Sequence, residues 1–131
     1  FFSKYESLII ELLRLSFSSN KKKEDTIQLF DWVNKVSLMG NEKIKDFLYY
    51  SVNFFRSAFL VNYNLEKIAP FESSTNFSIK NLSPYINKGN FKKFVVLFET
   101  SQNYIQQNAN KKMLLTEIVI KTKKLLSVSK N

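Results

Sequence analysis

The sequence of 131 residues contains no cysteine and no histidine. Without cysteine the chain can form neither a disulfide bond nor a reactive thiol, and this composition is compatible with the cytoplasm, where we expect the protein to lie. Without histidine it lacks the commonest general base and the commonest metal ligand. A zinc site would have to be built from carboxylates alone, which is not the usual donor set for zinc.

The acidic residues and the glycines offer no substitute for that chemistry. The acidic residues are scattered, and no two of them stand at a spacing that suggests acid–base catalysis. Gly40 and Gly89 stand alone, so the sequence has no glycine-rich loop for phosphate binding. We therefore expect no enzyme activity and no cofactor in this chain.

Glycine and proline are scarce, with two of each, which leaves little material for the tight turns of a sheet with many short strands. No stretch approaches the 18 or more apolar residues of a membrane span, and we expect no membrane association. Because 44% of the residues are hydrophobic and the length suits one domain, the composition predicts a compact all-α domain over residues 1–131. The chain enters a helical pattern almost at once, which suggests a C-terminal piece of a longer protein.

The strongest hydrophobic pattern covers residues 44–63. The residues that recur there at helical spacing are Ile44, Phe47, Leu48, Ser51, Val52, Phe55, Ala58 and Phe59. Tyr50, Phe54 and Val61 widen this apolar face to an arc of about 200°, more than a helix at the edge of a domain needs. We therefore expect a central helix that is contacted from two directions. The strip expected to face water consists of Lys45, Asp46, Tyr49, Asn53, Arg56 and Ser57.

Weaker periodic patterns predict further helices, for a total of five or six. They cover residues 3–17, 24–39, 91–107 and 111–126, with a short helical piece at 79–86 and a frayed tail at 127–131. In the helix at 24–39 the core stripe is expected to be Leu29, Phe30, Val33 and Val36, with Trp32 at its margin.

Residues that favour helix ends mark the boundaries between these segments. Gly40 is expected to close the helix at 24–39 in a left-handed conformation, and Asn41 to cap the next helix. Asn90 is expected to cap the helix at 91–107. Asn108 and Asn110 suit a tight corner before the last helix, because asparagine tolerates left-handed dihedrals and its amide can cap a helix.

Two apolar residues of the last helix do not fit its core stripe. Met113 and Ile120 lie together on the opposite side, beside Glu117 and Lys124. They are either ordinary exposed residues or the centre of a contact patch for a partner protein, and the pattern alone leaves both interpretations open.

The net charge of +9 is concentrated in the second half of the chain. Residues 73–131 contribute +8, because Glu99 and Glu117 are the only acids among them. This asymmetry indicates either a negatively charged neighbour, such as nucleic acid or an acidic protein face, or a lysine-rich solvated surface.

The order of these segments resembles a known family. The resemblance is carried by LFDWVNKVSLMGNEKIKDFLYYSVNFFRSAFLVNY (29–63) and LSPYINKGNFKKFVVLFETSQNYIQQNANKKMLL (82–115). In these segments Trp32 precedes Gly40–Asn41, and Asn108–Ala109–Asn110 leads into the last helix. The sequence is similar in this order, over about residues 5–126, to the C-terminal domains of bacterial DNA polymerase III delta-prime subunits. Lys111 departs from the pattern, in which proline is expected.

The resemblance implies a role in the clamp loader. In that family two N-terminal modules with the ATPase-type fold precede the domain, and other subunits hydrolyse ATP. The C-terminal domains of five subunits pack into a closed collar that supports loading of the sliding clamp on primed DNA. The implied partners are the other clamp-loader subunits, with DNA contacted only indirectly, and the isolated piece is expected to be monomeric or weakly associating. Met113, Glu117, Ile120 and Lys124 are the expected contact residues.

Two other functions remain open at this point. A basic helical nucleic-acid-binding module would use the positive second half, although its phenylalanines fall on core stripes, where they cannot stack on bases. A helical adaptor domain unrelated to replication would use the same kind of surface for another partner.

Overall fold

The computed structural model describes residues 2–18, 23–65 and 83–127, and within these ranges the chain is all-helical, without a strand. The elements are α1 (Phe2–Ser18), α2 (Lys23–Ser37), α3 (Asn41–Asn62), the 3-10 helix η2 (Ser83–Tyr85), α5 (Phe91–Gln106) and α6 (Lys111–Leu126). The all-α prediction is therefore confirmed. Of the helical piece expected at 79–86, only Ser83–Tyr85 forms a 3-10 turn, and residues 79–82 lie outside the described ranges. The expected frayed tail also lies outside them, apart from Ser127.

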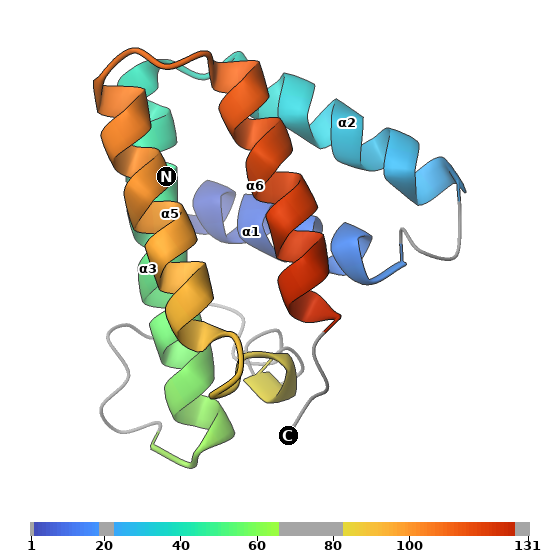
Figure 1. The fold of residues 1–131 in the computed structure, drawn as a ribbon, viewed down its shortest axis with the longest axis vertical. Coiled ribbons are helices and arrows are strands. Elements are labelled where there is room, and N and C mark those ends of the chain that lie inside the picture. The colour runs from blue at the N-terminus through green and yellow to red at the C-terminus, as the bar shows by residue number, and fades with distance from the viewer. Residues whose placement is uncertain (1, 19–22, 66–82, 128–131) are drawn as a thin grey trace.

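The helices form two groups that share a core, α3 with α5 and α1 with α2 and α6 (Figure 1). Helix α3 packs chiefly against the antiparallel α5 and also contacts α1 and η2. Helix α6 returns beside α5 and packs against α1 and α2. The expectation of a central α3 stays a prediction, because α2 and α6 pack chiefly against other helices.

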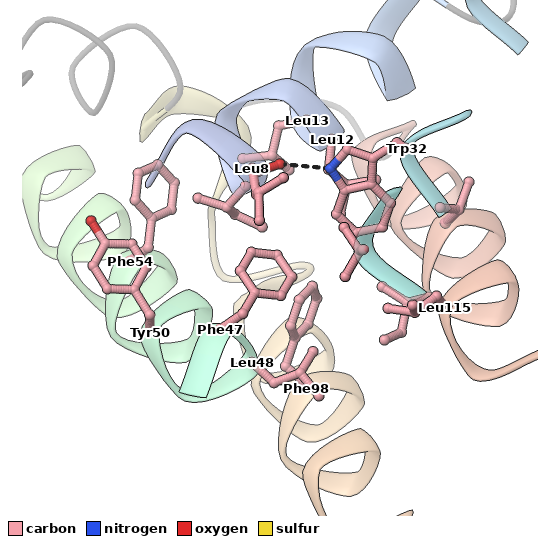
Figure 2. Close-up of a cluster of buried hydrophobic side chains, with 14 of the residues drawn as sticks. Leu8, Leu12, Leu13, Trp32, Phe47, Leu48, Tyr50, Phe54, Phe98 and Leu115 are labelled. Atoms are coloured by element: carbon pink, nitrogen blue, oxygen red, sulfur yellow. Dashed lines mark hydrogen bonds between the residues drawn. The ribbon is translucent and has the colours of Figure 1, made fainter. Parts of the chain in front are cut away.

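The core takes large apolar side chains from every one of the five α-helices (Figure 2). Its largest fully buried side chains are Trp32, Phe47, Phe54, Phe55, Phe94, Phe98, Ile9, Leu12, Leu13, Ile44, Leu48 and Ile86. Burial of each such side chain favours folding by about 1.5–3 kcal/mol, so apolar packing is the main source of the stability of the body. Helix α3 buries ten of its residues, more than any other helix within the described ranges.

Two helix faces differ from the sequence-based expectation. On α2, Phe30 is 54% exposed, whereas Trp32 is buried, so the predicted core position of the first and marginal position of the second were wrong. The reason is that α2 turns its Trp32 side toward α1, where the indole Nε1 donates a hydrogen bond of 3.0 Å to the carbonyl oxygen of Leu8. On α3, Ser57 is buried instead of facing water, while Tyr49 of the same strip is exposed as expected.

The junction between α2 and α3 also differs in detail. Gly40 has φ −65° and ψ 157°, an extended conformation, so the left-handed closure predicted for it was wrong. Gly40 is itself the residue that precedes the first turn of α3, and Asn41 is already inside the helix. Asn41 does not cap α3, because it lies inside the first turn instead of before it. Its side-chain Nδ2 donates to Oδ1 of Asn108 at 3.1 Å.

Asn90 precedes α5 as predicted, but its side chain makes no capping hydrogen bond. It is fully buried and its amide nitrogen donates to the carbonyl oxygens of Tyr85, at 2.7 Å, and Leu125, at 3.1 Å. Its Oδ1 accepts from the backbone N–H of Asn87 at 3.0 Å. Asn90 therefore connects the turn before α5 with the end of α6 instead of capping a helix.

Candidate partner-binding surfaces on helices α5 and α6

The corner before α6 has the geometry that its asparagines predict. Asn108 adopts a left-handed φ of 61°, and Oδ1 of Asn110 accepts a hydrogen bond of 3.0 Å from the backbone N–H of Met113. Both predictions for this corner are confirmed. Lys111 reaches back with its Nζ to the carbonyl oxygen of Met39 at 3.4 Å. The corner is thereby joined to the α2–α3 connection.

Helix α6 has one buried face and one exposed face. The buried face consists of Leu114, Leu115, Ile118, Val119, Thr122 and Leu126. On the opposite side Met113 is 72% exposed and Ile120 is 50% exposed, so two large apolar side chains meet water on the same face. They are seven residues apart, which places them about two turns from each other along the helix.

Charged side chains accompany this apolar pair. Glu117 lies between Met113 and Ile120 in sequence and is exposed, as is Lys124 one turn beyond Ile120. Glu117 Oε1 pairs with Lys121 Nζ at 2.6 Å, an exposed contact within one helical turn that adds little stability. We call Met113, Glu117, Ile120 and Lys124 the α6 patch. The structure exposes all four residues, and their role in partner binding stays a prediction.

A groove that was not among the sequence-based expectations lies between α5 and α6, with a volume of about 580 Å³. Its apolar wall is formed by Val96, Leu97, Tyr104, Leu114, Ile118 and Leu125. Its lysine side chains are Lys92, Lys93, Lys121 and Lys124. We call this surface the α5–α6 groove. It shares Glu117 and Lys124 with the α6 patch but lies on the side of α6 that faces α5.

The sequence held a signal for this groove. On each helix, four lining residues recur at positions i, i+4, i+7 and i+11. These residues are Lys93, Leu97, Thr100 and Tyr104 on α5, and Leu114, Ile118, Lys121 and Leu125 on α6. This stripe lies beside the core stripe on α5 and shares Leu114 and Ile118 with it on α6. The stripes became recognisable only once the two helices were placed side by side.

The phenylalanine side chains of α5 pack into or against the core. Phe94 and Phe98 are fully buried, and Phe94 stacks on Phe55 of α3 with 4.5 Å between ring centroids. Phe91 stacks on Phe59 at 4.3 Å. The fully buried rings of Phe94 and Phe98 have no free face for a nucleic-acid base.

One buried acidic residue lies away from both surfaces. Glu6 on α1 accepts a hydrogen bond of 3.3 Å from the Tyr50 hydroxyl on α3. Burial and the nearby Glu6 carboxylate raise the pKa of the Tyr50 phenol well above its ordinary value. Burial, and to a smaller extent the charge of Asp46, also raises the pKa of Tyr5. These groups lie at the α1–α3 contact, where they join two helices.

The described residues hold no group of three or more His, Cys, Asp or Glu side chains that could bind a metal ion. Within the same ranges, every helix is too short or too polar to cross a membrane. No protein-family model, no curated protein and no solved structure matches the chain.

Proposed function

We propose that this chain is a non-catalytic oligomerisation domain of a clamp-loader subunit, one of the helical domains that pack side by side into a collar. In this role it supports the loading of the sliding clamp on primed DNA, and it carries out no catalytic step itself. Its partners are the collar domains of the other loader subunits, and it contacts DNA only indirectly. It works in the cytoplasm.

The observation that carries this proposal is the α6 patch. Met113 and Ile120 form an exposed apolar pair on one helix face, and Glu117 and Lys124 flank it with charges of both signs. Protein–protein interfaces commonly have an apolar centre within a polar rim, and a few central side chains supply most of the binding energy. The patch therefore has the composition of a docking surface.

The positions that carry the family resemblance support the same role. Trp32 and Phe47 are buried in the core, and Asn110 caps α6. These residues fix the shape of a helical body and offer no reactive group. A domain that aligns its neighbours in a ring needs such a body, with docking surfaces on its outside.

The proposal is tested by replacing Ile120 with glutamate. The chain is co-expressed with the other clamp-loader subunits of the same genome, and assembly is measured by affinity capture and size-exclusion chromatography with light scattering. We expect Ile120→Glu to weaken assembly about tenfold or more. The substitution removes an apolar side chain from the centre of the interface and buries a charge in its place, and central side chains supply most of the binding energy.

Ile27→Glu is the matched control, because Ile27 is also an exposed isoleucine, 59% accessible, but lies on α2. Both variants should keep the helicity and melting temperature of the original chain, since neither side chain is in the core. Failure of the unaltered chain to assemble with any loader subunit contradicts the proposed function. Equal assembly by both variants and the original chain removes the α6 patch from it.

A further inference from the structure

The α5–α6 groove has an apolar wall, and some of the side chains in that wall stay exposed because no other described element covers them. Val96 is 51% exposed and Tyr104 is 49% exposed, and both line the groove. Single exposed apolar residues are common on protein surfaces, but apolar side chains gathered in one concave site mark a binding surface. The groove is therefore a candidate site in addition to the α6 patch.

The shape of the groove suits a helix. Its lining residues run from Lys92 to Tyr104 on α5 and from Leu114 to Leu125 on α6. At 1.5 Å per residue these stretches are about 16–18 Å long, which is about three helical turns. An amphipathic helix that binds between two others places its apolar side chains at i, i+3, i+4 and i+7. Each stripe of the groove likewise advances by three or four residues at a time, so a helix can lie along both. Strand addition requires an exposed sheet edge, and the described chain offers no sheet.

The charged side chains at the groove favour a negatively charged ligand. Four lysines line it, and Glu117 is the only acidic residue among the lining residues. Glu117 is paired with Lys121 at 2.6 Å, whereas Lys92, Lys93 and Lys124 have no ion-pair partner in the described part of the chain. These lysines lie at the end of the groove where α5 begins and α6 ends, and acidic side chains on a bound helix would meet them there.

We propose that the α5–α6 groove binds an acidic amphipathic helix of a partner protein. The helix inserts its apolar face between Leu97 of α5 and Leu125 of α6, which are both partly exposed, and its Asp and Glu side chains pair with Lys92, Lys93 and Lys124. The wall of the groove consists largely of aliphatic side chains, which suits an apolar helix face better than a nucleic acid that needs stacking platforms. This binding does not depend on the collar role, because Met113 and Ile120, the apolar centre of the α6 patch, do not line the groove, although Glu117 and Lys124 belong to both surfaces.

The test is a selection from a phage-displayed library of random 16-residue peptides on the 131-residue chain. Enriched peptides are synthesised with a fluorescein label, and their binding is measured by fluorescence anisotropy at two salt concentrations. We expect the enriched sequences to combine apolar residues at helical spacing with flanking Asp and Glu, and to bind less tightly at high salt. Amide chemical-shift changes should fall on α5 and α6.

Val96→Glu is the variant that separates the groove from the rest of the surface. It places a negative charge on the exposed wall, so affinity for the enriched peptides should fall at least tenfold with an unchanged melting temperature. Ile120→Glu, which changes the α6 patch and not the groove, should leave peptide affinity within about twofold. This pair of variants also distinguishes failure of this inference from failure of the collar proposal.

Several results would overturn the inference. They are a selection that enriches no peptide, enrichment of basic or uncharged peptides, and equal binding of the peptides by Val96→Glu. Displacement of the peptides by an oligodeoxythymidine of 20 nucleotides would assign the groove to nucleic acid instead. A dimer in light scattering that Val96→Glu dissociates would assign it to a second copy of the chain.

Discussion

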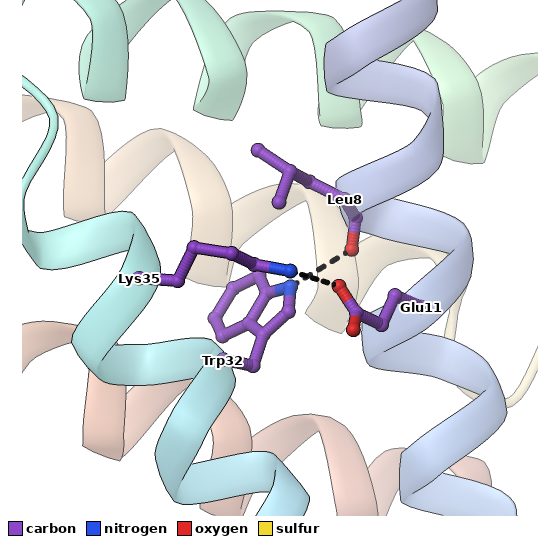
Figure 3. A network of polar contacts seen from close by, with 4 residues as sticks. All are labelled: Leu8, Glu11, Trp32 and Lys35. Atoms are coloured by element: carbon purple, nitrogen blue, oxygen red, sulfur yellow. Dashed lines mark hydrogen bonds and ion pairs between the residues drawn. The ribbon is translucent and has the colours of Figure 1, made fainter.

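Trp32 connects α2 to α1 through one buried polar contact inside an apolar cluster (Figure 3). Its Nε1 donates to the Leu8 carbonyl oxygen at 3.0 Å, and its ring lies near Phe47 of α3 at 6.0 Å between centroids. Between the same two helices, Lys35 Nζ pairs with Glu11 Oε1 at 2.7 Å, but this pair is exposed to solvent. The two contacts have similar lengths but differ in burial, and burial determines how much each contributes to stability.

We expect Trp32→Phe to lower the free energy of unfolding by about 2–4 kcal/mol, because it removes a buried hydrogen bond and leaves a cavity beside α1. Lys35→Ala is the control in the same helix contact, and it should cost less than about 1 kcal/mol, since exposed ion pairs contribute little. Urea unfolding followed by circular dichroism measures both. Equal costs for the two variants would show that burial does not set the difference.

The errors at single residues have a common cause. The helical wheel of residues 24–39 identified Leu29, Val33 and Val36 as core, and all three are buried. It took Phe30 instead of Trp32 as the fourth member, which was wrong, because that choice depends on which flank of α2 meets α1. Likewise the Asn41 amide had a plausible local role as a cap, and its actual partner, Asn108, is 67 residues away in sequence. Local patterns predict stripes and helix ends, whereas tertiary partners select among the alternatives.

At the scale of helices, the pairing of α3 with α5 is the most extensive contact in the described chain. Aromatic rings interlock along it, with Phe55 stacked on Phe94 and also edge-on to Phe98 at 5.1 Å. The existence of both helices was predictable from strong apolar periodicity, and their observed limits agree with the prediction to within a few residues. Which ring stacks on which was not predictable, since it depends on the register between two helices about forty residues apart in sequence.

A double-mutant cycle on Phe55→Leu and Phe94→Leu measures the stacking at this contact. We expect a coupling energy of about 0.5–1.5 kcal/mol, the size found for aromatic pairs beyond their buried area. A second cycle that combines Phe55→Leu with Ile27→Ala on α2 is the control, and its two effects should add within about 0.5 kcal/mol. Additivity in the first cycle would mean that the stacked geometry contributes nothing beyond apolar burial.

Across the whole molecule, surfaces were harder to predict than the interior. The α6 patch followed from the wheel of a single helix, because a face opposite the core stripe must be exposed unless a partner covers it. The α5–α6 groove needed two helices at a given separation, with Asn110 capping α6 and the Asn90 amide joining the start of α5 to the end of α6. The lysine excess of residues 73–131 indicated that a binding surface in this half would be positively charged, but it did not indicate where on the surface the groove lies.

Because of the contact between α1 and α3, we expect the free energy of unfolding of the whole molecule to vary with pH in the alkaline range. Burial raises the pKa of Tyr50 above its ordinary value of about 10, and the Glu6 carboxylate that accepts its hydrogen bond raises it further. Tyr5, which packs against Tyr50 at 6.1 Å between ring centroids, has its pKa raised by burial and by Asp46. Both phenols therefore hold their protons more tightly in the folded protein than in the unfolded chain.

A raised pKa in the folded state means that the unfolded chain binds fewer protons above pH 10, so the free energy of unfolding should fall as the pH rises through that value. The contribution of Tyr50 is fully present below pH 10 and is lost above it. We therefore expect Tyr50→Phe to lose less stability between pH 9 and pH 11 than the original chain does, although it starts from a lower value because a buried hydrogen bond is gone. Urea unfolding at a series of pH values measures this slope.

Tyr49→Phe, at a 62% exposed position of the same helix, is the control, and it should keep the original slope. An unchanged slope in Tyr50→Phe would show that this phenol does not link folding to pH.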